Sequence, residues 1–155
     1  MSGETFPIRP ANPTDLAGVL ALYAQPDLDN GNVLTPAEAQ RIFDRFRRYP
    51  DYTLYVVDRG TRMVGSFALL IMDNLGHLGA PSAIVEDVVV DPLFQSRGVG
   101  HQMMQFAIEV AREKGCYKLV LSSNAKRERA HAFYESLGFE RHGYSFRMNL
   151  AEAAA

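Results

Sequence analysis

The sequence predicts an α/β domain in which a mixed, mostly antiparallel sheet with one parallel strand pair is flanked by about four helices. Two observations predict it. The apolar runs "YTLYVVD" and "MVGSFALLIM" flank the short turn "RGT", which is typical of an antiparallel hairpin. A strand pattern at 82–91, a helical pattern at 98–114 and a second strand pattern at 117–122 then predict a right-handed crossover, which pairs the two strands in parallel.

The remaining elements have local signals of their own. "FPIRPA" predicts a first strand, and Thr14 or Asp15 is expected to cap a helix that runs to Tyr23. "TPAEAQRIFDRFRRYP" carries a capping box, with Thr35 at the N-cap and Glu38 three residues later, so a second helix begins there. A last helix is predicted over 126–138, and "FERHGYSFRMNL" predicts a terminal strand or strand pair.

Composition restricts the class of protein. With 155 residues, the chain is expected to form one domain over 1–150, followed by a disordered tail at 151–155. Sixteen basic against 18 acidic residues give a net charge of −2, which disfavours bulk nucleic-acid binding. No apolar stretch approaches the roughly 20 residues of a membrane span, and no signal peptide is visible, so we expect a cytoplasmic protein without a membrane partner. Cys116 stands alone, and a structural thiol is favoured over a nucleophile.

The stretch "DPLFQSRGVGHQMM" places two glycines where a strand ends and a helix begins. Backbone N–H groups from Arg97 to Gly100 would point into the space before the helix, where the helix dipole adds positive potential. Gly98 and Gly100 lack the Cβ atoms that would block an approaching ligand. This pattern predicts an anion site suited to a pyrophosphate, with a ligand-free turn as the alternative. The Walker pattern is absent, and Met103 breaks the dinucleotide fingerprint.

Two motifs carry a family resemblance. "VVVDPLFQSRGVGHQMM" resembles motif A of the GCN5-related N-acetyltransferases (GNAT), whose Gln/Arg-x-x-Gly-x-Gly/Ala pattern is met by Gln95, Gly98 and Gly100. "AHAFYESLGF" resembles motif B of the same family. The resemblance implies the GNAT fold with a splayed parallel strand pair, acetyl-CoA as acetyl donor and no metal. It also implies direct attack by a primary amine in a ternary complex.

The resemblance also implies roles for particular residues. The backbone of Val88, Val89 and Val90 would pair with the pantetheine arm, and the turn formed by Gln95, Ser96, Arg97, Gly98, Val99, Gly100 and His101 would hold the pyrophosphate. Asn124 would meet the pantetheine or cap the next helix. Arg127, His131 and Tyr134 share one helix face that would look at the coenzyme, with Arg127 near the 3′-phosphate. Tyr134 would protonate the departing thiolate; a core tyrosine is the alternative.

The attacking amine must lose a proton, and "IVEDVVV" places two carboxylates in an apolar strand. Alternation sends Glu86 and Asp87 to opposite faces unless a bulge turns both to one side. A carboxylate partly desolvated by valines has a raised pKa, which suits a base. Glu86 is preferred and Asp87 is the reserve, with a structural ion pair as the alternative for either. The N–H of Val88 could polarise the thioester carbonyl.

The acceptor is the least readable part. "VEDVVVDP" and "GCYKLVL" resemble glucosamine-6-phosphate N-acetyltransferases, whereas "LSSNAKRERAHAFYESLGFERHGYSF" resembles aminoalkylphosphonate N-acetyltransferases. Both resemblances imply a small amine with an anionic phosphorus group. Candidate cations for that group are Arg45, Arg47, Arg48, Arg141, His142 and Arg147. A peptide or protein N-terminal acetyltransferase and a non-catalytic acyl-CoA sensor stay open as other classes. His77 could line the acceptor site, and "GYSFRMNL" could form a homodimer interface, as C-terminal strands do in the family.

Overall fold

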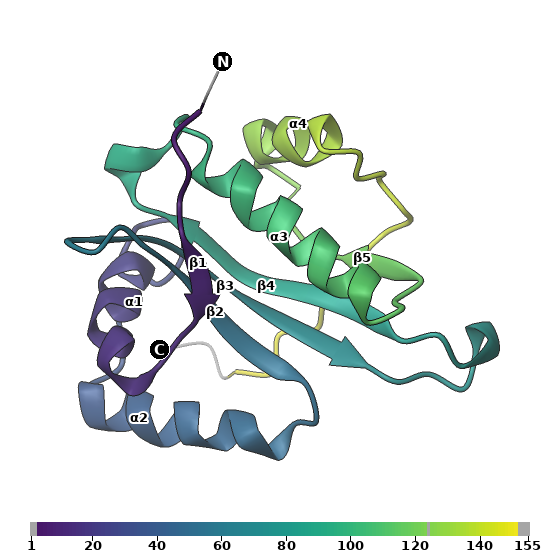
Figure 1. The fold of residues 1–155 in the computed structure, drawn as a ribbon, viewed down its shortest axis with the longest axis horizontal. Helices are drawn as coiled ribbons and strands as arrows, with labels where there is room; N and C mark the ends of the chain where they lie inside the picture. Colours follow the sequence, from purple (N-terminus) through teal and green to yellow (C-terminus); the bar gives the residue numbers. More distant parts are fainter. Residues whose placement is uncertain (1–2, 124, 152–155) are drawn as a thin grey trace. The chain divides into compact units, whose positions relative to one another are not determined.

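The computed structural model describes residues 3–123 and 125–151, and its centre is a five-stranded sheet in the order β1-β2-β3-β4-β5 (Figure 1). The strands are β1 (Ile8–Pro10), β2 (Tyr52–Asp58), β3 (Met63–Met72), β4 (Ser82–Val90) and β5 (Lys118–Val120). The first three pairings are antiparallel and β4 pairs with β5 in parallel, as the sequence predicts. Contacts within the chain define two compact units, one ending at Leu121 and one beginning at Ser122, and the whole sheet belongs to the first.

Four α-helices occur in the described residues: α1 (Leu16–Tyr23), α2 (Pro36–Arg45), α3 (Val99–Glu113) and α4 (Glu128–Ser136). None of these helices is both long and apolar enough to cross a bilayer. The predicted cap of α2 is confirmed, because the Thr35 side chain accepts from the N–H of Glu38 and the Glu38 carboxylate accepts from Thr35. α1 begins directly after Asp15, one of the two predicted cap residues, but the Asp15 side chain makes no capping hydrogen bond to the helix. Asn12 instead caps a 3₁₀ turn, Pro13–Asp15, that precedes α1.

The two faces of the sheet carry separate cores. On one face, Leu54, Val56 and Ala68 form a cluster with residues of α1 and α2. On the other face, the rings of Tyr55 and Phe67 contact Phe106 of α3, with centroids 5.0 and 6.4 Å apart. Neighbouring residues of β2 therefore serve opposite layers, as the two-residue period of a strand requires.

Gly65 of β3 sets how closely α3 approaches the sheet. A Cβ at this position would lie 2.9 Å from the Met103 sulfur and 3.2 Å from a methyl group of Val99. Met103 and Val99 are almost completely buried, so neither can move aside without opening a gap in the core. Glycine is thus required here by helix–sheet packing, and it fixes the position of the first turns of α3.

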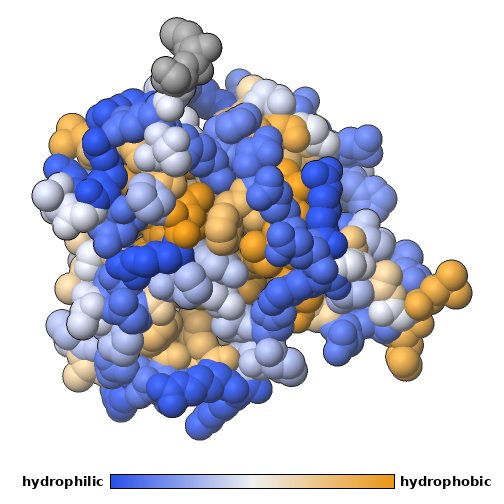
Figure 2. Space-filling view, viewed as in Figure 1, coloured by the Kyte–Doolittle hydropathy of each residue, from blue (hydrophilic) through white to orange (hydrophobic). Residues whose placement is uncertain are grey.

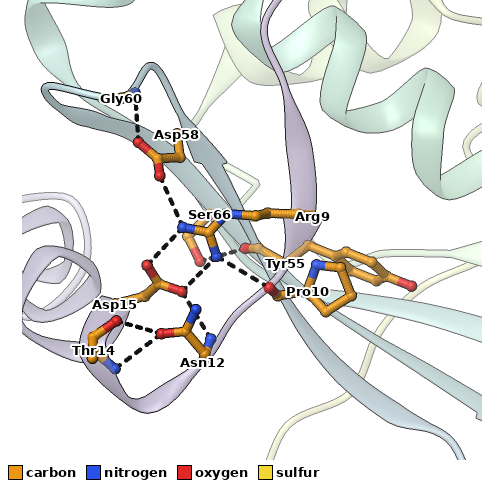
Figure 3. A network of polar contacts seen from close by, with 9 residues as sticks. All are labelled: Arg9, Pro10, Asn12, Thr14, Asp15, Tyr55, Asp58, Gly60 and Ser66. Carbon is orange, nitrogen blue, oxygen red and sulfur yellow. Dashed lines mark hydrogen bonds and ion pairs between the residues drawn. The ribbon is translucent and has the colours of Figure 1, made fainter.

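Arg9 joins the first strand to the first helix and to the β2–β3 hairpin (Figure 3). Its guanidinium donates to both oxygens of Asp15, at 2.7 and 2.9 Å, and to Asp58 at 2.8 Å. Asp15 is 8% exposed and also accepts from the N–H of Asn12. Arg9 therefore satisfies a buried carboxylate and ties three elements together.

The predicted terminal strand is wrong: residues 139–150 form no strand in the structure. Their alternation is real, since Tyr144, Phe146, Met148 and Leu150 recur at every second position, but all four are 80–93% exposed. An alternating pattern specifies which side chains share a face, whereas a strand also needs a neighbour for its backbone groups. The described residues of this segment have no such neighbour.

We expect Asp15→Asn to lower the free energy of unfolding at pH 7 by about 1–3 kcal/mol, because a buried charge-assisted pair is lost. Asp51→Asn, at the more exposed pair with Lys114, should cost about 1 kcal/mol or less. Hydrogen bonds from Arg9 hold the pKa values of Asp15 and Asp58 below the ordinary 3.8. The stabilisation is therefore present above that pH and is lost as the pH falls through the lower native pKa values. Urea unfolding at pH 7 and pH 3 measures this; equal losses for the two variants at pH 7 would contradict it.

Candidate functional site

Within the described residues, the outer edge of β4 has no neighbouring strand along its second half. Pairing with β5 covers Ser82 to Ile84 only, while β4 continues to Val90. The N–H of Asp91 donates to Val64 of β3 at 2.8 Å, so by alternation the backbone groups of Val88 and Val90 point away from β3. This edge is the one to which the sequence assigns the pantetheine arm.

Gln25, which follows α1, reaches the same edge. Its side-chain amide donates to the carbonyl of Val90 at 3.1 Å. The sequence analysis missed this residue because a glutamine in a turn-rich loop carries no pattern. The contact ties the connection between α1 and α2 to the end of β4.

A β-bulge in β4 places both carboxylates on one face. Phe67 of β3 stands opposite two residues of β4, since Ser66 pairs with Val89 and Ala68 pairs with Glu86. Asp87 is in the left-handed region, with φ of 53°. Cross-strand partners share a face, so Glu86 lies on the α1/α2 face with Ala68, and Asp87 lines a cavity on that same face. The bulge therefore interrupts the alternation of side chains along β4 and places Glu86 and Asp87 on the same face of the sheet.

The electrostatics agree with this placement. Partial burial raises the pKa of both carboxyls, and the charge of Asp87 adds to the rise at Glu86. Burial raises the pKa of Tyr52, and the charges of both carboxylates raise it further. Burial and the charge of Asp87 also raise the pKa of Tyr23. Both phenols stay protonated at neutral pH and can donate hydrogen bonds. The sequence analysis named Tyr23 only as the end of a helix.

Two cavities open on the α1/α2 face of the sheet. The smaller, about 90 Å³, is largely apolar and has Asp87 in its lining together with Tyr23 and Tyr52. The larger, about 420 Å³, lies beside Arg47 and Tyr49. The two cavities share four lining residues: Phe43, Phe46, Tyr52 and Leu54. Tyr52 therefore lines both the larger cavity and the smaller cavity that contains the Asp87 carboxylate.

The glycine turn has the features of an anion site. Gly98 is the N-cap of α3 with φ of 92°, Ser96 has φ of 63°, and no side chain caps the helix. Among the described residues, the N–H groups of Arg97 and Gly98 meet no acceptor. A Cβ on Gly98 would have no atom within 4 Å, so the space before the helix is open. These donors and the first turn of α3 fit a phosphate group.

The second unit carries the motif B residues. Tyr134 lies in α4 between two aromatic rings, with centroids 5.2 Å from Phe133 and 5.8 Å from Phe139. Burial raises its pKa, and the charge of Arg127 lowers it. Arg127 is the N-cap of α4, and His131 donates its N–H to the Arg127 carbonyl, so the three predicted residues share one helix face. Asn124 lies outside the described residues.

Other predicted positions have plainer surroundings. His77 stacks on Tyr117 with centroids 3.9 Å apart, in the β3–β4 loop that projects at the right of Figures 1 and 2 and shows apolar atoms there. Burial raises the pKa of Cys116, which keeps the thiol protonated and argues against a nucleophile. Within residues 3–123 and 125–151, no three His, Cys, Asp or Glu side chains gather into a group that could hold a metal ion.

Comparison with known proteins identifies the family. Residues 16–139 match the acetyltransferase (GNAT) family. This chain belongs to the GNAT family. It is an acetyl-CoA-dependent N-acetyltransferase, as the sequence motifs predict.

Three relatives are informative. Glucosamine 6-phosphate N-acetyltransferase of Trypanosoma brucei brucei is 34% identical over 144 residues, which cover 92% of this chain and 95% of that protein. Aminoalkylphosphonate N-acetyltransferase of Salmonella typhimurium is 33% identical over 88 residues, covering 57% and 56% of the two chains. The solved structure of a putative acetyltransferase from Agrobacterium tumefaciens superposes with a TM-score of 0.84 at 34% identity, covering 92% of this chain and 99% of that one.

Replacing Asp87 by glycine tests the strain in the bulge. We expect Asp87→Gly to raise the free energy of unfolding by up to about 1 kcal/mol, since glycine adopts positive φ without steric cost. Glu86→Gly, at an extended position, should lower it by about 0.5–1 kcal/mol. Because the pKa of Asp87 is raised, its ionisation costs stability as the pH rises through that value, so the gain should be larger at pH 7 than at pH 3. Thermal unfolding of both variants measures this; a less stable Asp87→Gly would refute the strain.

Proposed function

We propose that this chain acetylates the amine of glucosamine 6-phosphate. The observation that carries the proposal is the full-length match to an enzyme of that name, at 34% identity over 92% of this chain and 95% of the relative. The match to the aminoalkylphosphonate enzyme covers little more than half of each chain. Both names describe small amines with an anionic phosphorus group, so the aminoalkylphosphonates form the second candidate class.

The coenzyme lies along the free half of β4 and ends at the glycine turn. Backbone groups of Val88, Val89 and Val90 hold the pantetheine amides as a neighbouring strand would. The N–H groups from Gln95 to His101 hold the pyrophosphate. The coenzyme roles that the family resemblance implies for Asn124, Arg127 and His131 stay predictions. The open space before Gly98 and the end of the β4–β5 pairing at Ile84 support this assignment.

Asp87 is the base that takes the proton from the attacking amine. The raised pKa of Asp87 suits that role, and its side chain lines the smaller cavity on the α1/α2 face. Glu86 is not among the lining residues of either cavity. Glu86, on the same face, helps to draw the ammonium form of the substrate toward the site. We therefore prefer Asp87, the reserve candidate of the sequence analysis, to Glu86 as the base.

Tyr134 is the acid for the leaving group. The amine nitrogen forms a bond to the thioester carbon, the carbon–sulfur bond breaks, and the thiolate takes the phenol proton of Tyr134. The N–H of Val88 stabilises the oxyanion that develops on the carbonyl. A phenol that burial keeps protonated supports the assignment of Tyr134.

Arg47 is the cation that recognises the phosphate of the acceptor. Among the cations named from the sequence, it lines the larger cavity, which adjoins the smaller cavity containing Asp87. Phosphate recognition by a guanidinium there would leave the amine end free to reach the carboxylate.

We further propose a cytoplasmic homodimer. The free Cys116 supports a reducing compartment. The exposed alternating residues from Tyr144 to Leu150 support an interface with a second copy, whose sheet edge would supply the missing backbone neighbour. Sedimentation velocity of the protein and of Phe146→Ser tests this; a monomeric wild type at micromolar concentration would refute it.

Free-thiol release from acetyl-CoA identifies the acceptor. We expect glucosamine 6-phosphate to be acetylated at least about tenfold more efficiently, in kcat/KM, than glucosamine, aminoalkylphosphonates or short peptides, since ~1.4 kcal/mol of phosphate recognition corresponds to tenfold. Arg47→Gln should raise the KM for glucosamine 6-phosphate several-fold and leave the KM for glucosamine unchanged. Arg41→Gln, on α2 ahead of the 3₁₀ turn Phe46–Arg48 that carries Arg47 and outside both cavity linings, should change neither value. Preference for a peptide or for glucosamine would overturn the proposed acceptor.

Substitution at the two catalytic groups separates their roles. Tyr134→Phe should lower kcat by about 10²–10⁴-fold with little change in coenzyme affinity, because only the proton donor is lost. Asp87→Asn should remove the acidic limb of the pH profile of kcat/KM, since the protonated carboxyl no longer limits the rate at low pH. Stopped assays from pH 5 to pH 9, with calorimetric coenzyme binding, measure both effects. Wild-type rates for either variant would exclude that residue from the chemistry.

A further inference from the structure

An N-terminal arm, residues 4–7, lies against the first turn of α3. The N–H of Phe6 donates to the side-chain oxygen of Gln102 at 2.8 Å, and the Gln102 amide donates back to the Glu4 carbonyl at 2.6 Å. Phe6 is 3% exposed and meets Phe94 edge to face, with centroids 6.5 Å apart. The arm is therefore a docked part of the fold, and it passes beside the connection that leads into α3 (Figure 1).

The Glu4 carboxylate pairs with two arginines from different elements. One oxygen accepts from Arg97 at 2.8 Å and the other pairs with Arg59 of the β2–β3 turn. Both guanidinium groups also lie over the ring of Phe94, at 4.5 Å for Arg97 and 5.2 Å for Arg59. The Arg97 side chain is thus held on one side by a carboxylate and on another by an aromatic face.

Arg97 stands between the two left-handed residues of the turn. Ser96 has φ of 63° and Gly98 has φ of 92°, and Ser96 has no glycine-like freedom to adopt its value without cost. A strained turn keeps one conformation only if its surroundings hold it there. Because Arg97 is the residue between these two positions, contacts that hold its side chain restrict the conformations open to the turn.

We propose that Glu4 is a positioning residue for the coenzyme, acting through Arg97 on the glycine turn. The proposal rests on the proposed pyrophosphate site and adds a restraint from a residue 93 positions away in the sequence. In this arrangement the turn binds the pyrophosphate through its backbone, while the Arg97 guanidinium stays with Glu4 and Phe94. Preorganising the donors lowers the conformational cost of binding, so the effect falls on affinity and not on the chemical step.

Glu4→Gln tests the proposal, and Asp58→Asn is its matched control. Glu4 and Asp58 are 33% and 31% exposed, and each accepts from an arginine Nη2 at 2.8 Å. We expect Glu4→Gln to raise the Kd for coenzyme A about fivefold, the equivalent of ~1 kcal/mol for an exposed ion pair, with kcat at saturating acetyl-CoA unchanged. Asp58→Asn should leave the Kd unchanged. Titration calorimetry and steady-state kinetics measure both quantities.

The sign of the change decides between two roles of Glu4. If Glu4 merely competes with the pyrophosphate for Arg97, Glu4→Gln will tighten coenzyme binding, and that result overturns the proposal. So would an equal weakening in Asp58→Asn, which would indicate a general loss of stability. Arg97→Gln should weaken binding as much as Glu4→Gln, and the double variant no more than either, because the two residues act as one unit. Additive losses would assign Arg97 a direct contact and refute the proposed route.

Gly98→Val distinguishes failure of the coenzyme site from failure of the arm. It should abolish detectable coenzyme binding, whereas Gly115→Val, at φ of 76° beyond the other end of α3, carries similar backbone strain and should keep full affinity. Full affinity in Gly98→Val would remove the pyrophosphate site, and the role of Glu4 with it. If Gly98→Val loses affinity while Glu4→Gln keeps the wild-type affinity, the pyrophosphate site stands. Only the positioning role of Glu4 is then refuted.

Discussion

The extra residue that β4 inserts opposite Phe67 is the constraint on which the rest of the site depends. Without it, Glu86 and Asp87 would face opposite layers, one toward α3 and one toward α1 and α2. With it, both lie on the α1/α2 face, while the backbone groups of Val88 and Val90 turn toward the free edge. In the proposed function, this one irregularity directs two side chains toward the acceptor and backbone groups toward the coenzyme. The left-handed conformation of Asp87 is the conformational cost of that division.

The short pairing of β4 with β5 complements the bulge. A strand edge with unpaired groups is a liability unless something covers it, and β5 leaves the edge after Ile84. Gln25 satisfies the carbonyl of Val90 from the α1 side. The remaining donors and acceptors suit a ligand with its own amide groups, which pantetheine has. The part of the β4 edge that follows the bulge is therefore also the part that β5 does not pair with.

Local patterns predicted the elements, whereas contacts between distant residues could not be predicted. Thr35 with Glu38 specified the start of α2 and the two glycines specified the turn, because each signal lies within a few residues. The bulge carries no glycine, so nothing in "IVEDVVV" distinguished it from a regular strand. The pairs of Glu4 with Arg97 and of Arg9 with Asp58 span 93 and 49 positions, and single charges have no pattern that names their partner. The strand predicted at the C-terminus was wrong for a related reason. Alternation shows which side chains share a face, but it does not identify a neighbouring strand for the backbone groups.

The distribution of charge gives the proposed acceptor a direction. In the proposed complex, Glu86 and Asp87 attract the ammonium end of the amino-sugar phosphate and repel its phosphate. The phosphate must therefore lie away from the bulge, and the adjoining larger cavity leads from Tyr52 toward Arg47. A neutral amino sugar would gain attraction at one end only and could bind in more than one orientation. The phosphate thus contributes to specificity by excluding the reversed orientation as well as by adding affinity, because a reversed substrate would place like charges together at Asp87.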